Sequence, residues 1–344
     1  MKQQGAQNQH YVSKFMLRNF LTDTDKEQVS VIDKLSGKTF SPNIHGVMSE
    51  RRFNEFVIDD DHVASFEPAV CRIEEQVLPT YRDVVENRRL RGTMEERINL
   101  AFFMAFQLTR TKGQRETFKQ LDAMVRTKFE KMGHDVTDEL PENTDEELKV
   151  RHADFMRRSL KDFTAILSQK TFLLAAAAPN RSFYLGDNPI VLNKTKAKSD
   201  ENDLFWGLGL GVLGVEVYLP LSKDLLLCAW CPSIRADLEA HYQKLRNEFD
   251  QMVVAEMLKG GIDIGGVAAL RQKWEAQENH PKRILDAMDQ GIPIHSEPTN
   301  MDLYNSLQMF SATRFVICPD GDYQLARQFI DENPHHQGRQ LQSN

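Results

Sequence analysis

The chain has 344 residues, 41% of them hydrophobic and 27% charged, so it can bury a substantial core in one large domain or two coupled ones. Its formal net charge of −7 argues against a broad electrostatic grip on nucleic acid, which normally needs a strongly basic surface. The 4 cysteines are too few for a disulfide framework in a chain of this length. Neither a secretory leader nor an apolar run of about 20 residues is recognised, so we expect a cytoplasmic protein with no membrane segment.

Residues 1–60 predict a short helix followed by a hairpin. The helix is expected over residues 12–21, where several large apolar side chains are available for burial. Residues 28–33 alternate in hydrophobicity, Ser36-Gly37 supplies a turn, and residues 38–40 begin the returning strand. Beyond them the pattern is irregular, with short extended pieces.

Residues 61–170 are predicted to be helical. Pro68 and Pro79 must mark helix starts or kinks in the first part. Residues 93–132 give the strongest helical pattern, because Thr93 and Glu96 form a capping-box pattern and apolar residues then recur at three- and four-residue spacing. An acidic, turn-rich segment and a further helix complete this region.

Residues 171–332 are predicted to mix strands and helices. Short strand patterns occupy residues 171–178, 182–185, 189–193, 214–219, 225–230 and 314–318. Helical patterns occupy residues 234–258, 267–278, 281–289, 300–312 and 322–331. We therefore predict a helix-rich α+β fold in a single large domain, residues 1–332, in which a long helical layer packs on a small mixed or antiparallel sheet. Residues 333–344 are expected to form a disordered tail.

Two motifs resemble known sites but lack their structural context. Residues 209–214 match the glycine spacing of the dinucleotide fingerprint, yet strand formers ending in Pro220 follow in place of a helix, so no nucleotide cofactor is expected. Cys228 and Cys231 form a C-x-x-C pair without a second pair of ligands for zinc, and Pro232 follows. Both cysteines are predicted to be buried and inert.

Residues 9–20 carry the first of three polar groups that packing does not explain. If they form one helix, His10, Lys14 and Arg18 share one face, which would suit an anionic partner. A solvated basic stripe opposite a buried aromatic face is the alternative. If Ser13 is the N-cap, His10 lies outside the helix.

The second and third polar groups interrupt apolar segments. Gln107 and Arg110 lie in a strongly apolar helix, where Arg110 either reaches water or is held in a cleft to bind carboxylate or phosphate. Residues 186–189, Gly-Asp-Asn-Pro, join two predicted strands. They form a structural turn, or they place Asp187 in a cleft as a general base or metal ligand.

These segments resemble the domain-of-unknown-function 4238 family of bacteria and some other organisms. The resemblance extends over residues 9–330 and is carried by Gln9 to Phe20, Gln107 with Arg110-Thr111, Asp187-Asn188-Pro189 and Leu219-Pro220-Leu221-Ser222. It departs at Ser13, where the family usually has proline, and at Gly186, where serine is common. The resemblance implies where the fold begins and ends. It implies no activity, because the family's activity is not established.

A functional site follows if the three segments meet in space. His10 can then act as general acid or base, Arg110 can hold an anion, and Asp187 can orient His10 or bind a divalent metal ion. The predicted substrate- or anion-binding residues are Lys14, Arg18, Gln107 and Asn188. The matching reaction is phosphoester cleavage in a nucleotide or nucleic acid, by a hydrolase or nuclease.

Two alternatives assign no catalysis to these residues. In one, the protein is a binding or effector module with a basic anion pocket. In the other, the polar residues form a buried network that locks the helical layer onto the sheet. The sequence carries no signal for oligomeric state.

Overall fold

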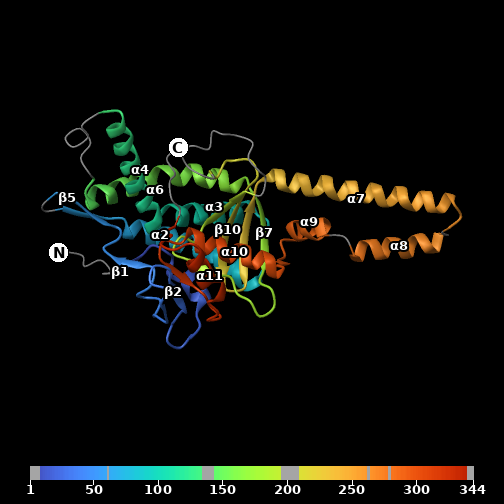
Figure 1. Ribbon diagram of the computed structural model, residues 1–344, viewed down its shortest axis with the longest axis horizontal. Helices are drawn as coiled ribbons and strands as arrows, with labels where there is room; N and C mark the ends of the chain where they lie inside the picture. Colours follow the sequence, from blue (N-terminus) through green and yellow to red (C-terminus); the bar gives the residue numbers. More distant parts are fainter. Residues whose placement is uncertain are drawn as a thin grey trace.

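The computed structural model of the protein describes residues 8–59, 62–133, 143–194, 209–261, 264–277 and 280–338. The strands of its central sheet are β7 (Thr171–Ala176), β9 (Val191–Lys194), β10 (Val215–Ser222), β11 (Leu225–Trp230) and β12 (Ile294–His295). They lie in the order β12-β7-β11-β10-β9, and all neighbours are antiparallel except β12 and β7. The labels β7 and β10 mark this sheet in Figure 1. The predicted mixed sheet, formed mostly by the second half of the chain, is therefore present.

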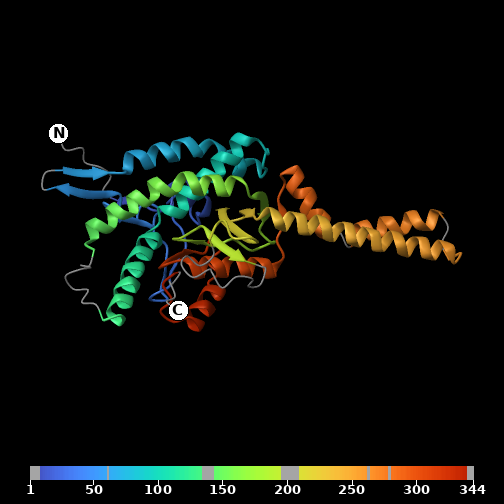
Figure 2. The same ribbon diagram turned by 90° about the horizontal axis from the view of Figure 1, so that it is seen from above.

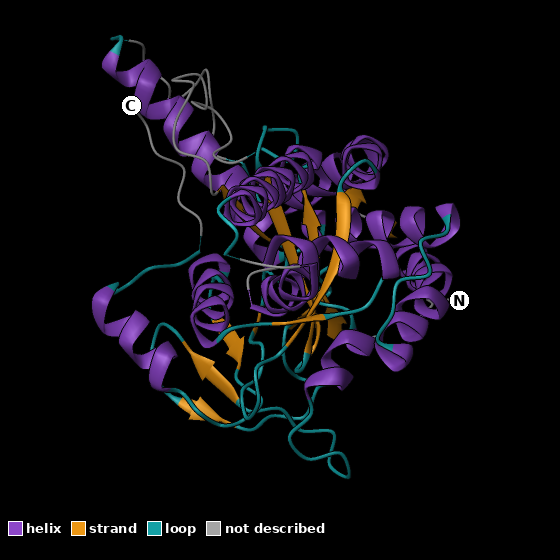
Figure 3. Ribbon diagram, turned by 90° about the vertical axis from the view of Figure 1, so that its right-hand side faces the viewer, coloured by secondary structure: helices purple, strands orange, loops and turns teal. Residues whose placement is uncertain are grey.

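Alternate residues of this sheet face two helical layers, as the pleat requires. On one face, Leu174 and Val217 belong to a core cluster shared with α2, α3 and α6, while Leu173 and Tyr218 on the other face pack against α9 and α10. The bounds of these helices are α2 (Glu67–Asn87), α3 (Met94–Thr109), α6 (Asp145–Ser168), α9 (His280–Gln290) and α10 (Pro298–Ser311). Figures 2 and 3 show the strands enclosed between helices, which confirms the α+β class with a long helical layer.

The predicted helical stretch 93–132 is interrupted. It forms α3 and α4 (Lys112–Lys131), with Arg110 as the C-cap of the first and Thr111 as the N-cap of the second. The Thr111 hydroxyl accepts a hydrogen bond from the Gln114 N–H at 3.3 Å. Because α4 begins anew at this cap, it projects away from the helical layer (Figure 1).

The start of the chain differs from a single helix. His10 ends strand β1 (Asn8–His10), which pairs with β4 (Ser49–Arg51), and Ser13 caps α1 (Lys14–Leu17), which continues as the 3₁₀ helix η1 (Arg18–Phe20). His10 therefore lies outside the helix, as in the alternative that made Ser13 the N-cap. The predicted one-helix stripe of His10, Lys14 and Arg18 is wrong.

A smaller sheet joins the two ends of the chain. Its strands are β2 (Val31–Asp33), β3 (Thr39–Phe40), β8 (Leu185–Gly186) and β13 (Phe315–Ile317), in the antiparallel order β3-β2-β13-β8. The predicted hairpin is its β2–β3 edge. A second hairpin, β5 (Glu55–Asp59) and β6 (His62–Ser65), occupies part of the region predicted to be helical. Helix α2 begins only after it, with Pro68 in the first turn, where the missing N–H of proline costs nothing.

A two-helix arm projects from the body (Figures 1 and 2). It consists of α7 (Pro232–Leu258) and α8 (Ile264–Gln277), and the 27 residues of α7 correspond to a length of about 40 Å. Trp274 of α8 stacks on Phe249 and Tyr242 of α7, with ring centroids 4.9 and 6.4 Å away. Within the described ranges, no helix combines the length and apolar character required to cross a bilayer.

The last described residues are packed against the body. After α11 (Gln324–Glu332), the His336 Nε2–H donates to the Phe310 carbonyl at 2.8 Å, and its ring contacts Phe310 and Phe329. His336 thus connects the segment 333–338 to α10 and α11, whereas the predicted disordered tail of residues 333–344 stays a prediction. Residues 339–344 lie outside the described part of the chain.

His152 is a buried imidazole between α6 and the α3–α4 break. Its Nε2–H donates to the Thr109 carbonyl at 2.7 Å. Burial is the main cause that lowers the pKa of His152 to about 4, and Arg115 acts in the same direction. Because an unfolded chain keeps an imidazole pKa of about 6.5, the unfolded state binds more protons between these values, and stability falls as the pH decreases through this window.

We expect the change in the protonation of His152 alone to lower the free energy of unfolding by about 2–3 kcal/mol between pH 7 and pH 4.5. Urea unfolding at the two pH values measures it. His152→Gln keeps an N–H donor for Thr109 without titrating, so its free energy of unfolding should depend less on pH. His45→Gln, at an exposed imidazole, is the control. An equal acid loss in His152→Gln and the unaltered protein would contradict the assignment.

Candidate functional site

Gln107 holds the N-terminal segment against α3. Its Oε1 accepts hydrogen bonds from the Ser13 N–H and hydroxyl, both at 3.3 Å, and its Nε2 donates to the Tyr11 carbonyl at 2.8 Å. The side chain is fully buried. Both ends of the carboxamide are thus bound to protein, and Gln107 acts as a cross-link between segments 94 residues apart.

Arg110 continues the same network. Its Nη1 donates to the Ser13 hydroxyl at 3.1 Å and to Glu74 Oε1 at 2.6 Å, and its Nη2 donates to the His10 carbonyl. The side chain is 2% exposed, and its guanidinium lies 4.5 Å from the centroid of the Phe106 ring. The planar fork is therefore directed at acceptors of the protein itself.

His10 is a neighbour of Arg110, although the two side chains do not bond to each other. The ring Nε2 lies 2.8 Å from the Ile44 carbonyl, to which it donates. Burial is the largest cause that lowers the pKa of His10, with the Lys14 and Arg110 cations adding to it. His10 is thus held as a neutral donor to the main chain.

Lys14 and Arg18 lie in a surface network. Lys14 Nζ lies 3.2 Å from His45 Nδ1, Arg18 Nε donates to Glu27 Oε1 at 3.0 Å, and His45 Nε2 lies 3.2 Å from Glu27 Oε2. The two cations predicted to bind an anion therefore have partners on the protein surface.

Asp187 fixes the turn before β13. Its Oδ1 accepts the Thr313 N–H at 2.7 Å, and its Oδ2 accepts the N–H groups of Arg314 and Phe315 at 2.9 and 3.0 Å. Asp187 is 2% exposed, and burial raises its pKa while the three N–H donors act in the opposite direction. Among the described residues it shares no hydrogen-bond partner with His10 or Arg110, and no group of three or more His, Cys, Asp or Glu side chains is placed to hold a metal ion.

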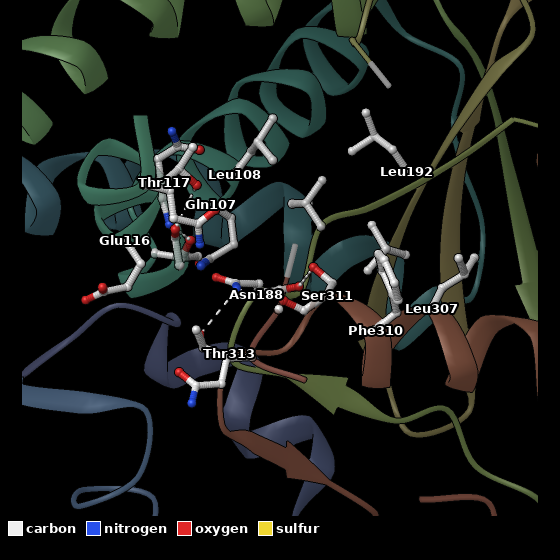
Figure 4. A pocket seen from close by; sticks show the side chains of 18 residues that line it. Gln107, Leu108, Glu116, Thr117, Asn188, Leu192, Leu307, Phe310, Ser311 and Thr313 are labelled. Carbon is white, nitrogen blue, oxygen red and sulfur yellow. Dashed lines mark hydrogen bonds between the residues drawn. The ribbon is translucent and has the colours of Figure 1, made fainter. Parts of the chain in front are cut away.

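A cavity of about 180 Å³ lies at the α3–α4 break and unites parts of the predicted site. Gln107 and Asn188, from two of the three polar segments, both line it (Figure 4). We name it the amide cavity because its described lining includes the carboxamides Gln107, Gln114, Gln120, Asn188 and Gln337. His10, Lys14, Arg18, Arg110 and Asp187 are not part of this lining.

Asn188 is the central polar residue of the amide cavity (Figure 4). Its Nδ2 donates to the Ser311 carbonyl at 2.9 Å, and its main-chain carbonyl accepts the Ser311 hydroxyl at 3.1 Å. Its Oδ1 is buried with no hydrogen-bond partner in the described chain. A Cβ at Gly113 would lie 2.6 Å from that oxygen, so only glycine at this position of α4 leaves room for the Asn188 side chain.

The remaining lining is mostly uncharged. Hydroxyls come from Thr111, Thr117, Ser311 and Thr313, and apolar walls come from Leu108, Ile190, Leu192, Leu307 and Phe310. Glu116 is the ionisable side chain of the described lining, which includes no Lys, Arg or His. Such a surface can form many neutral hydrogen bonds between apolar walls, but it offers no cationic side chain to a phosphate.

Sequence reasoning missed the residues of α4 and α10 that complete the cavity. Thr111 and Gln114 have the T-x-x-Q spacing of a capping box, a signal that would have located the start of α4. Ser311 is the last residue of α10 and Thr313 follows its C-cap, and nothing in the sequence distinguishes them.

The comparisons with known proteins agree with the resemblance found in the sequence. A family model described as "Protein of unknown function (DUF4238)" matches residues 8–322. The comparisons with curated proteins and with solved structures gave no match. All three polar segments and the α4 residues of the cavity fall within the matched range.

Proposed function

Because the chain belongs to the family described as Protein of unknown function (DUF4238), a description that names no activity, we propose a function from the amide cavity alone. The protein is a binding module for an uncharged heterocycle of about the size of a nucleobase. The observation that carries this proposal is the lining of carboxamides and hydroxyls between apolar walls, without a Lys, Arg or His among the described lining residues.

The ligand class follows from size and hydrogen-bonding chemistry. A cavity of about 180 Å³ is smaller than the pockets that enclose drug-sized ligands, so it suits a single ring system. Asn188 Oδ1 has no hydrogen-bond partner in the described chain, and a carboxamide oxygen can accept a hydrogen bond from an N–H at the edge of a base. The apolar side chains can then cover the faces of the ring. A nucleotide or a nucleic acid is a compatible source of such a ring.

The contacts of His10, Arg110 and Asp187 favour phosphoester cleavage less than they favour a structural role for these residues. The guanidinium of Arg110 and both carboxylate oxygens of Asp187 are buried and bonded to protein atoms. Their contacts support the alternative in which these residues form a polar network that joins the layers of the fold.

Isothermal titration of the full chain tests the proposal. The probes are adenine, cytosine, uracil and nicotinamide, with inorganic phosphate as the contrasting probe. We expect at least one heterocycle to bind and phosphate not to bind. If only phosphate binds, or if none of the heterocycles does, the proposal is wrong.

A cavity-filling variant locates the binding site. The Thr117 hydroxyl donates within its own helix, to the Gly113 carbonyl at 3.0 Å, so Thr117→Leu preserves α4 while adding apolar volume at the cavity wall. We expect it to weaken binding at least about tenfold, equivalent to 1.4 kcal/mol. Thr127→Leu, on an exposed position of the same helix, is the matched control and should bind like the unaltered protein. Equal binding by Thr117→Leu would place the ligand elsewhere.

A further inference from the structure

A cluster of reactive side chains lies at one end of the central sheet, apart from the amide cavity. Cys231 directly follows β11 and is the N-cap residue of α7, with Pro232 in the first turn. The last register pair of β11 and β7 is Trp230 with Thr171. The next residues, Cys231 and Lys170, are therefore neighbours across the end of the sheet, on the same face.

Lys170 is a buried cation held beside Cys231. It is 4% exposed, and its Nζ donates to the Val215 carbonyl at 3.2 Å. The same carbonyl accepts the Cys231 N–H at 3.1 Å, which fixes the ammonium next to the cysteine. Among the described residues no carboxylate forms an ion pair with this ammonium, and a buried charge is costly unless it is paired. Burial lowers the pKa of Lys170, and Cys231 acts in the opposite direction, towards the ammonium form.

The surroundings of the sulfur favour the thiolate. The Ser233 hydroxyl donates to Cys231 Sγ at 3.1 Å, and the positive end of the 27-residue helix α7 lies at the same place. Burial acts to raise the pKa of Cys231, but the Ser233 hydroxyl, the N–H groups of Gly214 and Ser233, and Lys170 outweigh it and lower the pKa.

Other charged groups nearby are engaged elsewhere. Arg235, one turn further along α7, pairs with Glu239 and Asp289, both at 2.8 Å. Arg97 of α3 donates to the carbonyls of Ser168 and Lys170. Lys170 is thus the cation that acts on Cys231.

The other three cysteines have the opposite character. Cys71 is exposed, but burial of its thiol and the carboxylates Glu67, Glu74 and Glu75 raise its pKa. Burial raises the pKa of Cys228 and Cys318, which lie in the core. Cys231 is 8% exposed, and the residue that follows it, Pro232, is exposed.

We infer that Cys231 is the reactive thiol of this chain, paired with Lys170 and Ser233, and the site at which hydrogen peroxide and small electrophiles modify the protein. With peroxide, the thiolate sulfur attacks one oxygen, an S–O bond forms as the O–O bond breaks, and hydroxide leaves, which yields a sulfenic acid. Cys228 is fully buried in the core cluster facing α9 and α10, so it cannot form a disulfide with Cys231. The sulfenic acid therefore has no thiol at Cys228 with which to condense, and dimedone can trap it before further peroxide oxidises it to a sulfinic acid.

Mass spectrometry of each cysteine in the native, full-length protein tests this. The protein is alkylated with iodoacetamide at pH 6 to 9, and separately treated with hydrogen peroxide and dimedone. At pH 7 we expect Cys231 to be alkylated about tenfold faster than Cys71. The reason is that the thiol with the lower pKa has the larger thiolate fraction, by about tenfold for each unit of difference in pKa. The dimedone adduct should be found on Cys231. Faster alkylation of Cys71, or an adduct elsewhere, would overturn the inference.

Variants of the two partners separate this effect from simple accessibility. Lys170→Met removes the charge at similar size and should move the pH profile of Cys231 alkylation upward, and Ser233→Ala should move it in the same direction. Lys223→Met, at an exposed lysine, is the matched control and should leave the profile unchanged. If Lys170→Met does not fold, the comparison of Ser233→Ala with the unaltered protein still tests whether the neighbouring side chains set the pH profile of Cys231. Identical profiles in Ser233→Ala and the unaltered protein would end the proposed pairing.

Discussion

Asp187→Ala is expected to lower the free energy of unfolding by about 4 kcal/mol, because three main-chain N–H groups lose their shared acceptor together. Each orphaned donor costs about 1–3 kcal/mol, and the carboxylate of Asp187 is the acceptor for Thr313, Arg314 and Phe315. The turn that starts β13 should loosen, and with it the sheet that joins the two ends of the chain. Urea denaturation monitored by circular dichroism measures the change.

Two further variants serve as comparisons for Asp187→Ala. Asp187→Asn keeps the size but offers one acceptor oxygen to the three donors, so we expect an intermediate loss of about 2–3 kcal/mol. Asp154→Ala removes a surface carboxylate that pairs with Arg157 and Arg158, and should change the free energy of unfolding much less than either Asp187 variant. A catalytic Asp187 without a structural role would leave the unfolding midpoint of Asp187→Ala unchanged.

Arg110→Met is expected to destabilise the protein by about 3 kcal/mol. The substitution leaves the Glu74 carboxylate, the Ser13 hydroxyl and the His10 carbonyl without their shared donor. Removing one partner of a buried ion pair costs about 3–5 kcal/mol, and the lower figure applies because Glu74 is 25% exposed and can regain water. The midpoint of urea unfolding gives the value directly.

The anion-binding interpretation of Arg110 makes the contrary prediction. A guanidinium kept for a substrate is a cost to the fold, so its replacement by methionine would be neutral or stabilising. Arg18→Met, at a residue whose side chain is 48% exposed and paired with Glu27, should change the free energy of unfolding by less than about 1 kcal/mol. Combining Arg110→Met with Glu74→Gln should cost less than the sum of the two single changes, because both act on one contact.

The three polar segments were recognisable in the sequence, whereas the roles of their side chains were not. A glutamine within an apolar helix can line a cleft or cross-link two segments, and only its partners distinguish the two. For Gln107 these partners are Tyr11 and Ser13, which the local pattern of α3 does not contain. Gln107 does both: its carboxamide is bonded to the N-terminal segment, and its side chain forms part of the cavity wall.

Two boundaries were missed although the sequence contained their signals. Apolar periodicity continues from α3 into α4, and it concealed the cap at Thr111 and Gln114 that divides the helix. The helix predicted over residues 234–258 begins two residues earlier, because proline is favoured in the first turn and α7 starts at Pro232. Reading Pro232 as a helix start would have placed Cys231 at a positive helix end and set it apart from Cys228.

The α7–α8 arm has a consequence for how the mass of the particle is measured. A compact chain of this length has a radius of gyration of about 20 Å, and α7 alone extends about 40 Å. Hydrodynamic drag increases with such elongation, so a single chain elutes early from a gel-filtration column and mimics a larger assembly. Light scattering or sedimentation equilibrium, which do not depend on shape, will report how many chains the particle contains.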